Sequence, residues 1–195
     1  MIISISGVPG SGKTSVAKII ADKLGMNFYS MGNMRGKMAL DRGMTIDELN
    51  ALGEKEAFTD AEVDEYQKKL GQTEDNFVIE GRLSWHFIPH SYKVFLGCDV
   101  DEAARRIFGA KQTSTTERTD EAPTSTIEQV RSALATRMTS DDVRYKKYYG
   151  ADYRDHSHYD LVVDTMETSS PEETAEIILQ ELERYNQMTT PQTEK

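Results

Sequence analysis

Short apolar segments recur along the chain and are separated by longer stretches of mixed polarity. Each segment is rich in Val, Ile, Phe or Tyr, which is typical of buried β-strands. The expected strands are residues 2–6, 27–30, 76–80, 92–96 and 160–165. Between them the apolar side chains instead follow helical spacing, as in residues 16–24. This alternation of strand and helix patterns predicts an α/β fold with a parallel sheet.

Capping signals mark where several of the expected helices begin and end. Gly25 follows the first helix and is expected to terminate it. Asp99 is expected to begin the helix that contains residues 102–107, rather than to bind a metal. Capping-box patterns start at Thr45 and Thr59, where a glutamate follows at the required spacing. These boxes predict two helices between the second and third strands.

The segment of residues 32–71 therefore reads as a helical insertion between the second and third strands. Its last helix carries only a sparse apolar stripe at Val63, Tyr66 and Leu70. With so few strong core residues the helix should be thin and partly exposed. We expect the insertion to move.

Residues 109–126 form a second unusual segment, rich in Thr and Ser and almost without large apolar side chains. Such a segment cannot bury itself, so it is either a mobile lid or a loop without stable structure. Its arginine, Arg118, is either a charge that a closing lid would deliver to a bound ligand or an ordinary solvated side chain.

The length of the chain, 195 residues, fits a single domain. We assign residues 1–186 to it and expect a frayed polar tail at residues 187–195. Outside the insertion and the lid, the core of this domain consists of residues 1–31, 76–108 and 127–186.

Residues 7–14, Gly-Val-Pro-Gly-Ser-Gly-Lys-Thr, fit the pattern G-x-x-x-x-G-K-[ST] and lie between a strand and a helix. Glycines let successive backbone N–H groups converge on phosphate oxygens. Lys13 can reach the β- and γ-phosphates, and the Thr14 hydroxyl is suited to Mg²⁺. A glycine-rich turn that matches by chance is the alternative, made rarer by the flanking elements. The phosphate-binding candidates are Gly7, Gly10, Ser11, Gly12, Lys13, Thr14 and Ser15.

Two further sets of residues have the chemistry to complete such a site. Glu80 ends the third strand, where a carboxylate beside the loop could hold Mg²⁺ through water, or could be an ordinary acid at a strand end. A long helix from residue 126 or 127 to about 149 places Arg137, Asp141 and Arg144 on one face. The two guanidinium groups could clamp a phosphate while the carboxylate accepts from a base amine. An exposed ladder of ion pairs is the alternative.

Composition narrows the classes of partner. The formal net charge of −10 argues against nucleic acid as a partner. No apolar run approaches the length of a membrane span, and Met1 leads directly into the first strand, so we expect neither a membrane segment nor a signal peptide. The lone cysteine, Cys98, cannot form an internal disulfide and fits a reducing compartment. We expect a cytoplasmic monomer that acts on a small molecule.

Taken together, these residues resemble the P-loop nucleoside monophosphate kinases and, within them, the cytidylate kinase-like family. The resemblance rests on residues 7–14, on Ser30 before Gly32, on Glu80-Gly81-Arg82, on the Arg137, Asp141 and Arg144 constellation, and on the strand around residues 159–165. It implies the P-loop NTPase fold, with three α/β/α layers and five parallel strands in the order 2-3-1-4-5. It further implies an ATP site at residues 7–14, a helical insertion that binds a monophosphate, and a lid.

The resemblance also implies roles for single residues. Ser30, Arg82 and Asp141 would lie near the cytosine or its ribose phosphate, while Arg137 and Arg144 would grip the transferring phosphates. Members of the family tend to carry an arginine four residues after the glycine that matches Gly32. In this chain that position is Gly36, and the neighbouring Arg35 is the substrate-binding candidate.

The implied reaction is ATP + (d)CMP ⇌ ADP + (d)CDP, supported by Mg²⁺. Direct transfer needs no covalent intermediate, so the protein contributes positioning and charge stabilisation. The candidates for charge stabilisation are Lys13, Arg118, Arg137 and Arg144. One alternative is a kinase for another small acceptor, such as AMP, UMP or a shikimate-like alcohol. Another is a nucleotide-dependent switch that hydrolyses ATP slowly and reports to a partner protein.

Overall fold

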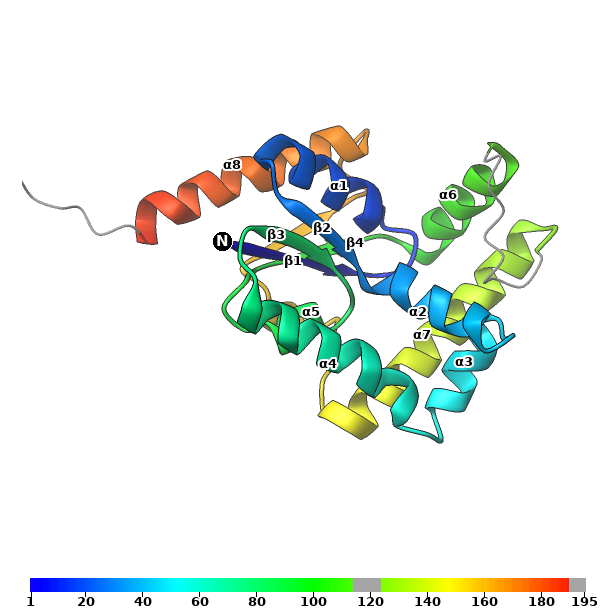
Figure 1. Ribbon diagram of the computed structural model, residues 1–195. Helices are drawn as coiled ribbons and strands as arrows, with labels where there is room; N and C mark the ends of the chain where they lie inside the picture. Colours follow the sequence, from blue (N-terminus) through cyan, green and yellow to red (C-terminus); the bar gives the residue numbers. More distant parts are fainter. Residues whose placement is uncertain (114–123, 190–195) are drawn as a thin grey trace, which may run out of the picture.

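A parallel sheet of five strands forms the centre of the molecule (Figure 1). The computed structural model describes residues 1–113 and 124–189. The strands are β1 (Ile2–Gly7), β2 (Asn27–Ser30), β3 (Phe77–Glu80), β4 (Tyr92–Gly97) and β5 (Leu161–Asp164). They pair in the order β2-β3-β1-β4-β5, and every pairing is parallel. Both the five strands and their order agree with the sequence predictions.

Helices α1 (Lys13–Leu24) and α8 (Pro171–Thr189) cover one face of the sheet. Alternation along β1 directs Ile3 and Ile5 toward this layer, where both are fully buried. As predicted, α1 ends at Gly25, which adopts a left-handed conformation with φ of 63°. Helix α8 continues to Thr189, past the end that we expected for the folded domain.

The opposite face of the sheet packs against α4 (Phe58–Thr73), α5 (Ser84–Phe87) and α7 (Ile127–Tyr149). Phe77 and Ile79 of β3 point into this layer, as does Phe95 of β4. A short 3-10 helix, His156–His158, leads from α7 toward β5. The molecule therefore has the three α/β/α layers that the sequence predicts.

The insertion between β2 and β3 is better packed than its sequence indicates. It consists of α2 (Met31–Asp41), α3 (Ile46–Gly53) and α4. Met38, Ile46, Leu49 and Val63 are buried in one apolar cluster that continues onto Ile79 of the sheet. The expectation of few core residues was wrong because the buried apolar side chains are distributed over three helices, each of which contributes only a few of them.

Only one of the two predicted capping boxes forms. The Thr45 hydroxyl accepts a hydrogen bond from the Glu48 amide, and the Glu48 carboxylate accepts one from the Thr45 amide. At Thr59 the prediction was wrong: α4 already begins at Phe58, and the Thr59 hydroxyl donates to the carbonyl of Glu56 instead. Thr59 is fully buried, so its side chain serves packing rather than a helix end.

The first residues of the segment that we expected to form the lid are helical. Helix α6 (Val100–Thr113) starts after Asp99, whose carboxylate accepts from the amides of Asp101 and Glu102 as expected. The helix then runs through residues 109–113, which we had assigned to the lid. Residues 114–123, including Arg118, lie outside the described residues. Residues 190–195 of the expected tail also lie outside them.

No helix in residues 1–113 or 124–189 is both long and apolar enough to cross a membrane.

Candidate active site

The loop between β1 and α1 has the backbone that a phosphate cradle requires. Gly7 and Gly10 have φ values of 144° and 78°, which favour glycine. Both are also closely packed: a Cβ at Gly7 would lie 2.2 Å from the carbonyl oxygen of Leu96, and one at Gly10 would lie 2.8 Å from the Cβ of Ala103. Gly12 immediately precedes α1, so the loop ends at the N-terminus of this helix, where backbone N–H groups can bind an anion.

Lys13 is folded back onto this loop. Its Nζ donates a hydrogen bond to the carbonyl oxygen of Val8, 2.6 Å away. Burial and the charge of Arg82 lower the pKa of Lys13 to about 7, with a smaller contribution in the same direction from Arg137 and an opposing one from Glu80. A bound phosphate would give this ammonium group a negatively charged partner in place of an uncharged carbonyl. The position of Lys13 thus fits a residue that exchanges a loop carbonyl for a phosphate oxygen.

Three oxygen-bearing side chains meet beside the loop. Thr14 Oγ1 donates to Glu80 Oε1 at 3.2 Å, and Ser30 Oγ donates to the same carboxylate oxygen. Glu80 is 5% exposed and lies at the carboxyl end of β3. A hydroxyl and a carboxylate beside a phosphate loop are donors that suit Mg²⁺, which keeps several waters and phosphate oxygens as its other ligands. These residues therefore fit the ion that the sequence predicts.

A buried cluster of arginines and aspartates lies on the side of the insertion. Arg82 Nε is 2.7 Å from Asp141 Oδ2, and Arg144 bridges Asp141 and Asp60. Arg35 Nη1 lies 2.8 Å from Asp60 Oδ1. Arg144 is fully buried and Asp141 is 1% exposed. Because these residues come from α2, α4, α7 and the turn after β3, the cluster joins the insertion to the core.

The backbone of Arg82 is fixed from two sides. Its carbonyl oxygen accepts hydrogen bonds from Ser6 Oγ of β1 at 2.9 Å and from Trp85 Nε1 of α5 at 3.0 Å. The Arg82 guanidinium is thereby directed toward Asp141, and its charge also reaches Lys13. Arg82 thus lies between the phosphate loop and the charge cluster.

The structure brings most of the predicted residues together but gives them different surroundings. Thr14, Ser30 and Glu80 meet directly, and Arg35, Arg82, Asp141 and Arg144 share the charge cluster. Arg137, on α7, is close enough to Lys13 to lower its pKa. Ser11 is buried in the loop, whereas Ser15 is exposed on α1.

Several buried polar residues around the site were not found from the sequence. Asp60 was assigned to a capping box, yet it contacts both Arg35 and Arg144. Asp64 accepts a hydrogen bond from Tyr149, and Gln67 accepts one from Ser84 at 2.7 Å. The spacing of Asp60, Asp64 and Gln67 places them on one face of α4, but a polar face usually indicates solvent. Only the facing residues of α5 and α7 show that this face is internal.

A cavity of about 400 Å³ lies next to the phosphate loop and was also missed. Ser11 and Gly12 form one wall, and the loop from Thr165 to Ser170 forms another. Arg106 lines it as well and donates to both the hydroxyl and the carbonyl of Thr165, each at 2.9 Å. The cavity has the size and position to take the base of a nucleotide whose phosphates occupy the loop.

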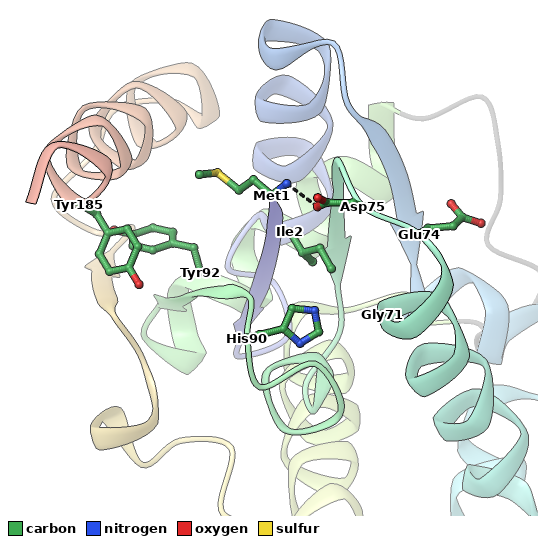
Figure 2. A pocket seen from close by; sticks show the side chains of 8 residues that line it. All are labelled: Met1, Ile2, Gly71, Glu74, Asp75, His90, Tyr92 and Tyr185. Atoms are coloured by element: carbon green, nitrogen blue, oxygen red, sulfur yellow. Dashed lines mark hydrogen bonds and ion pairs between the residues drawn. The ribbon is translucent and has the colours of Figure 1, made fainter. Parts of the chain in front are cut away.

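A second cavity, of about 450 Å³, lies at the opposite end of the sheet, and Figure 2 shows the side chains that line it. It lies around Met1 and Ile2, where β1 begins, whereas the phosphate loop follows the end of β1. His90 and Tyr92 also line it, and the Met1 ammonium group pairs with Asp75 there. It contains none of the predicted site residues, and ligands of open α/β sheets bind at the carboxyl ends of the strands. We therefore place the candidate site at the phosphate loop.

Comparison with protein families and relatives agrees with this placement. Residues 2–167 match the model of the family described as "Cytidylate kinase-like family". A cytidylate kinase from Methanocella arvoryzae is 38% identical over 85% of this chain and 87% of its own length. A cytidylate kinase from Archaeoglobus fulgidus is 35% identical over 94% of this chain and 95% of its own length.

Solved structures with low sequence identity share the fold. A shikimate kinase from Bacteroides thetaiotaomicron superposes with a TM-score of 0.61 at 17% identity, over 94% of this chain and 98% of the other. At this identity the likeness concerns the fold alone, and it agrees with the P-loop kinase arrangement of the sheet.

Proposed function

Because the chain belongs to the cytidylate kinase-like family, we propose that it transfers the γ-phosphoryl group of ATP to CMP or dCMP, which forms ADP and CDP or dCDP. The observation that carries this proposal is the position of Arg82. It lies between a phosphate loop built for a nucleoside triphosphate and a buried cluster rich in arginine. Such a cluster suits a second phosphorylated substrate.

The donor nucleotide would bind along the loop. Its phosphates would take the N–H groups of residues 7–14, and Lys13 would leave the Val8 carbonyl for the β- and γ-phosphates. The base would occupy the cavity between the loop and residues 165–170. Thr14 would hold Mg²⁺ directly and Glu80 through water, and the ion would neutralise part of the charge on the phosphates.

The transfer itself requires no protein nucleophile. The phosphate of CMP already carries a nucleophilic oxygen, which would attack the γ-phosphorus as the bond to ADP breaks. Lys13 and Arg137 would balance the charge on the equatorial oxygens, and Arg118 would add to them from the lid. Positioning of the two phosphates in line accounts for most of the rate increase.

The acceptor would bind at the charge cluster, with the insertion on one side. Ser30, Arg82 and Asp141 would meet the cytosine and the sugar, and Arg35 and Arg144 would meet the phosphate. Asp141 is an acceptor suited to an exocyclic amine, which distinguishes cytosine from uracil. Arg144 is enclosed by Asp60 and Asp141, so the acceptor phosphate would bind beside these ion pairs or replace one of them.

We also propose that the chain acts as a cytoplasmic monomer. The single cysteine, Cys98, cannot form an internal disulfide, which fits a reducing compartment.

A coupled assay of ADP release tests the proposal. Purified protein with Mg·ATP is supplied with CMP, dCMP, UMP, AMP, GMP or shikimate, and an acceptor-free sample and the variant K13A serve as controls. We expect strong stimulation by CMP or dCMP and none in K13A. Stimulation by another acceptor alone would contradict the assignment of the base and favour a kinase for that acceptor. Slow hydrolysis that no acceptor changes would favour a nucleotide-dependent switch.

A further inference from the structure

Asp60 is a buried carboxylate that two arginines share. Its Oδ1 lies 2.8 Å from Arg35 Nη1 and also accepts a hydrogen bond from Arg144 Nη1. The residue is 5% exposed. Its helix, α4, belongs to the insertion, whereas Arg144 belongs to α7. A single side chain therefore fixes two guanidinium groups from different parts of the molecule.

The two arginines need this carboxylate in order to lie close together. Burial is the main cause that lowers the pKa of Arg35, and the positive charge of Arg144 is the second. The second cause means that the two cations repel one another. Asn50 and the Thr59 carbonyl hold Arg35 at 2.9 and 2.8 Å, but both are uncharged. Among the described residues, Asp60 and Asp141 are the carboxylates that pair with Arg144, so without Asp60 only Asp141 would remain. Buried like charges would then separate.

Asp60 leaves binding capacity on both arginines. Arg35 Nη2 and Arg144 Nε are buried and have no hydrogen-bond partner in the described structure. The cluster also remains positive, because Arg35, Arg82 and Arg144 outnumber Asp60 and Asp141. A buried site with an excess positive charge and two unused donors is suited to an anion.

We propose that Asp60 is a positioning residue, which holds Arg35 and Arg144 side by side so that their remaining donors can bind the acceptor phosphate. This inference rests on the proposed function, since it assigns the anion to CMP. Asp60 itself does not contact the transferred group. Its removal should therefore weaken the binding of the acceptor and leave the binding of ATP unchanged.

The test compares D60N with D64N, a matched variant on the same face of α4. Asp64 is also buried, but it contacts Tyr149 rather than an arginine, and asparagine can still accept that hydrogen bond. In D60N we expect the KM for CMP to rise at least tenfold, while the KM for ATP stays within twofold. In D64N both KM values should stay within twofold. A general loss of structure would raise both KM values in D60N.

A second variant covers the case in which D60N does not fold. D60E keeps the charge, and its extra methylene displaces both arginines, so the KM for CMP should again rise while that for ATP does not. The inference is overturned by an unchanged KM for CMP in folded D60N, or in D60E if D60N is unfolded. Equal effects on both substrates, or an equal effect in D64N, also overturn it. The outcomes with the variants concern the role of Asp60 and leave the proposed function intact. Absence of activity toward CMP in the wild-type protein would instead overturn the proposed function.

Discussion

The hydroxyl of Thr14 donates a hydrogen bond to the carboxylate of Glu80 across 3.2 Å, although the two residues lie on α1 and β3. Parallel pairing of β1 with β3 aligns Ile5 with Glu80, which carries this carboxylate to the edge of the sheet where the phosphate loop begins. The pair of residues that would hold Mg²⁺ is therefore a direct product of sheet register.

The Glu80 carboxylate should set the requirement for Mg²⁺. In E80Q the side chain keeps its shape but loses its charge, so we expect the Mg²⁺ concentration for half-maximal activity to rise about tenfold, the equivalent of about 1.4 kcal/mol. Titration of activity with Mg²⁺ at saturating ATP and CMP measures it. E74Q, which changes an exposed acid bonded to Tyr29, is the control. An unchanged Mg²⁺ titration in E80Q would exclude this role for Glu80.

The lowered pKa of Lys13 should make ATP binding depend on pH. The pKa is about 7 without ligand, and phosphate favours the charged form and raises it. Below pH 7 Lys13 is charged both in the free protein and in the complex with ATP, so its contribution to the binding free energy does not change with pH. Above pH 7 binding requires uptake of a proton, and the Kd for ATP should rise up to tenfold per pH unit.

Calorimetry between pH 7 and pH 9, in buffers with different heats of ionisation, measures both the Kd and the proton uptake. The K13R variant keeps its charge over this range and should show neither effect. Proton uptake in K13R equal to that of the wild type would assign the effect to another group.

The buried ion pairs of Asp141 should contribute strongly to stability. Asp141 pairs with both Arg82 and Arg144, and D141A would leave two buried cations without this partner. We expect the free energy of unfolding to fall by about 3–5 kcal/mol, measured by urea denaturation. D142A removes the neighbouring acid, whose pair with Arg154 is more than a third exposed, and should cost less than about 1 kcal/mol. Similar losses in the two variants would contradict this account.

Gly53 lets α3 close onto the charge cluster. A Cβ at this position would lie 2.6 Å from Thr59 Oγ1 and 2.9 Å from Arg144 Cδ. We expect G53A to lower the free energy of unfolding by about 1–3 kcal/mol, because packed neighbours must move. G109A is the control, since a Cβ there meets no atom of the described residues within 4 Å, and it should be neutral or stabilising by up to about 1 kcal/mol. Thermal denaturation of both variants distinguishes these outcomes.

Local sequence patterns were sufficient for the sheet and for the phosphate loop. Runs of β-branched and aromatic residues identify each strand. The glycine pattern of residues 7–14 is typical of a phosphate-binding loop between a strand and a helix. Glu80 could be placed because its strand ends beside that loop. These predictions depend on residues close in sequence, or on the register of a parallel sheet.

The errors concern polar residues whose surroundings come from distant segments. Asp60 is hydrophilic and follows a threonine, so a helix start is the simplest interpretation, whereas Arg35 and Arg144 make it internal. Residues 109–113 lack large apolar side chains, yet they continue α6, where only one side of the helix has to be apolar. A polar side chain can face water, but its polarity alone does not show whether it faces water or another buried polar residue.

The polar face of α4 has a consequence for protein engineering. Asp60 contacts Arg144, Asp64 contacts Tyr149 and Gln67 contacts Ser84, so the insertion is matched side chain by side chain to α7 and α5. A chimaera that exchanges residues 31–73 alone between two relatives would bury charges and amides against foreign partners. Exchange of the acceptor half between such enzymes therefore requires the transfer of α5 and the second half of α7 with the insertion, as one recombination block.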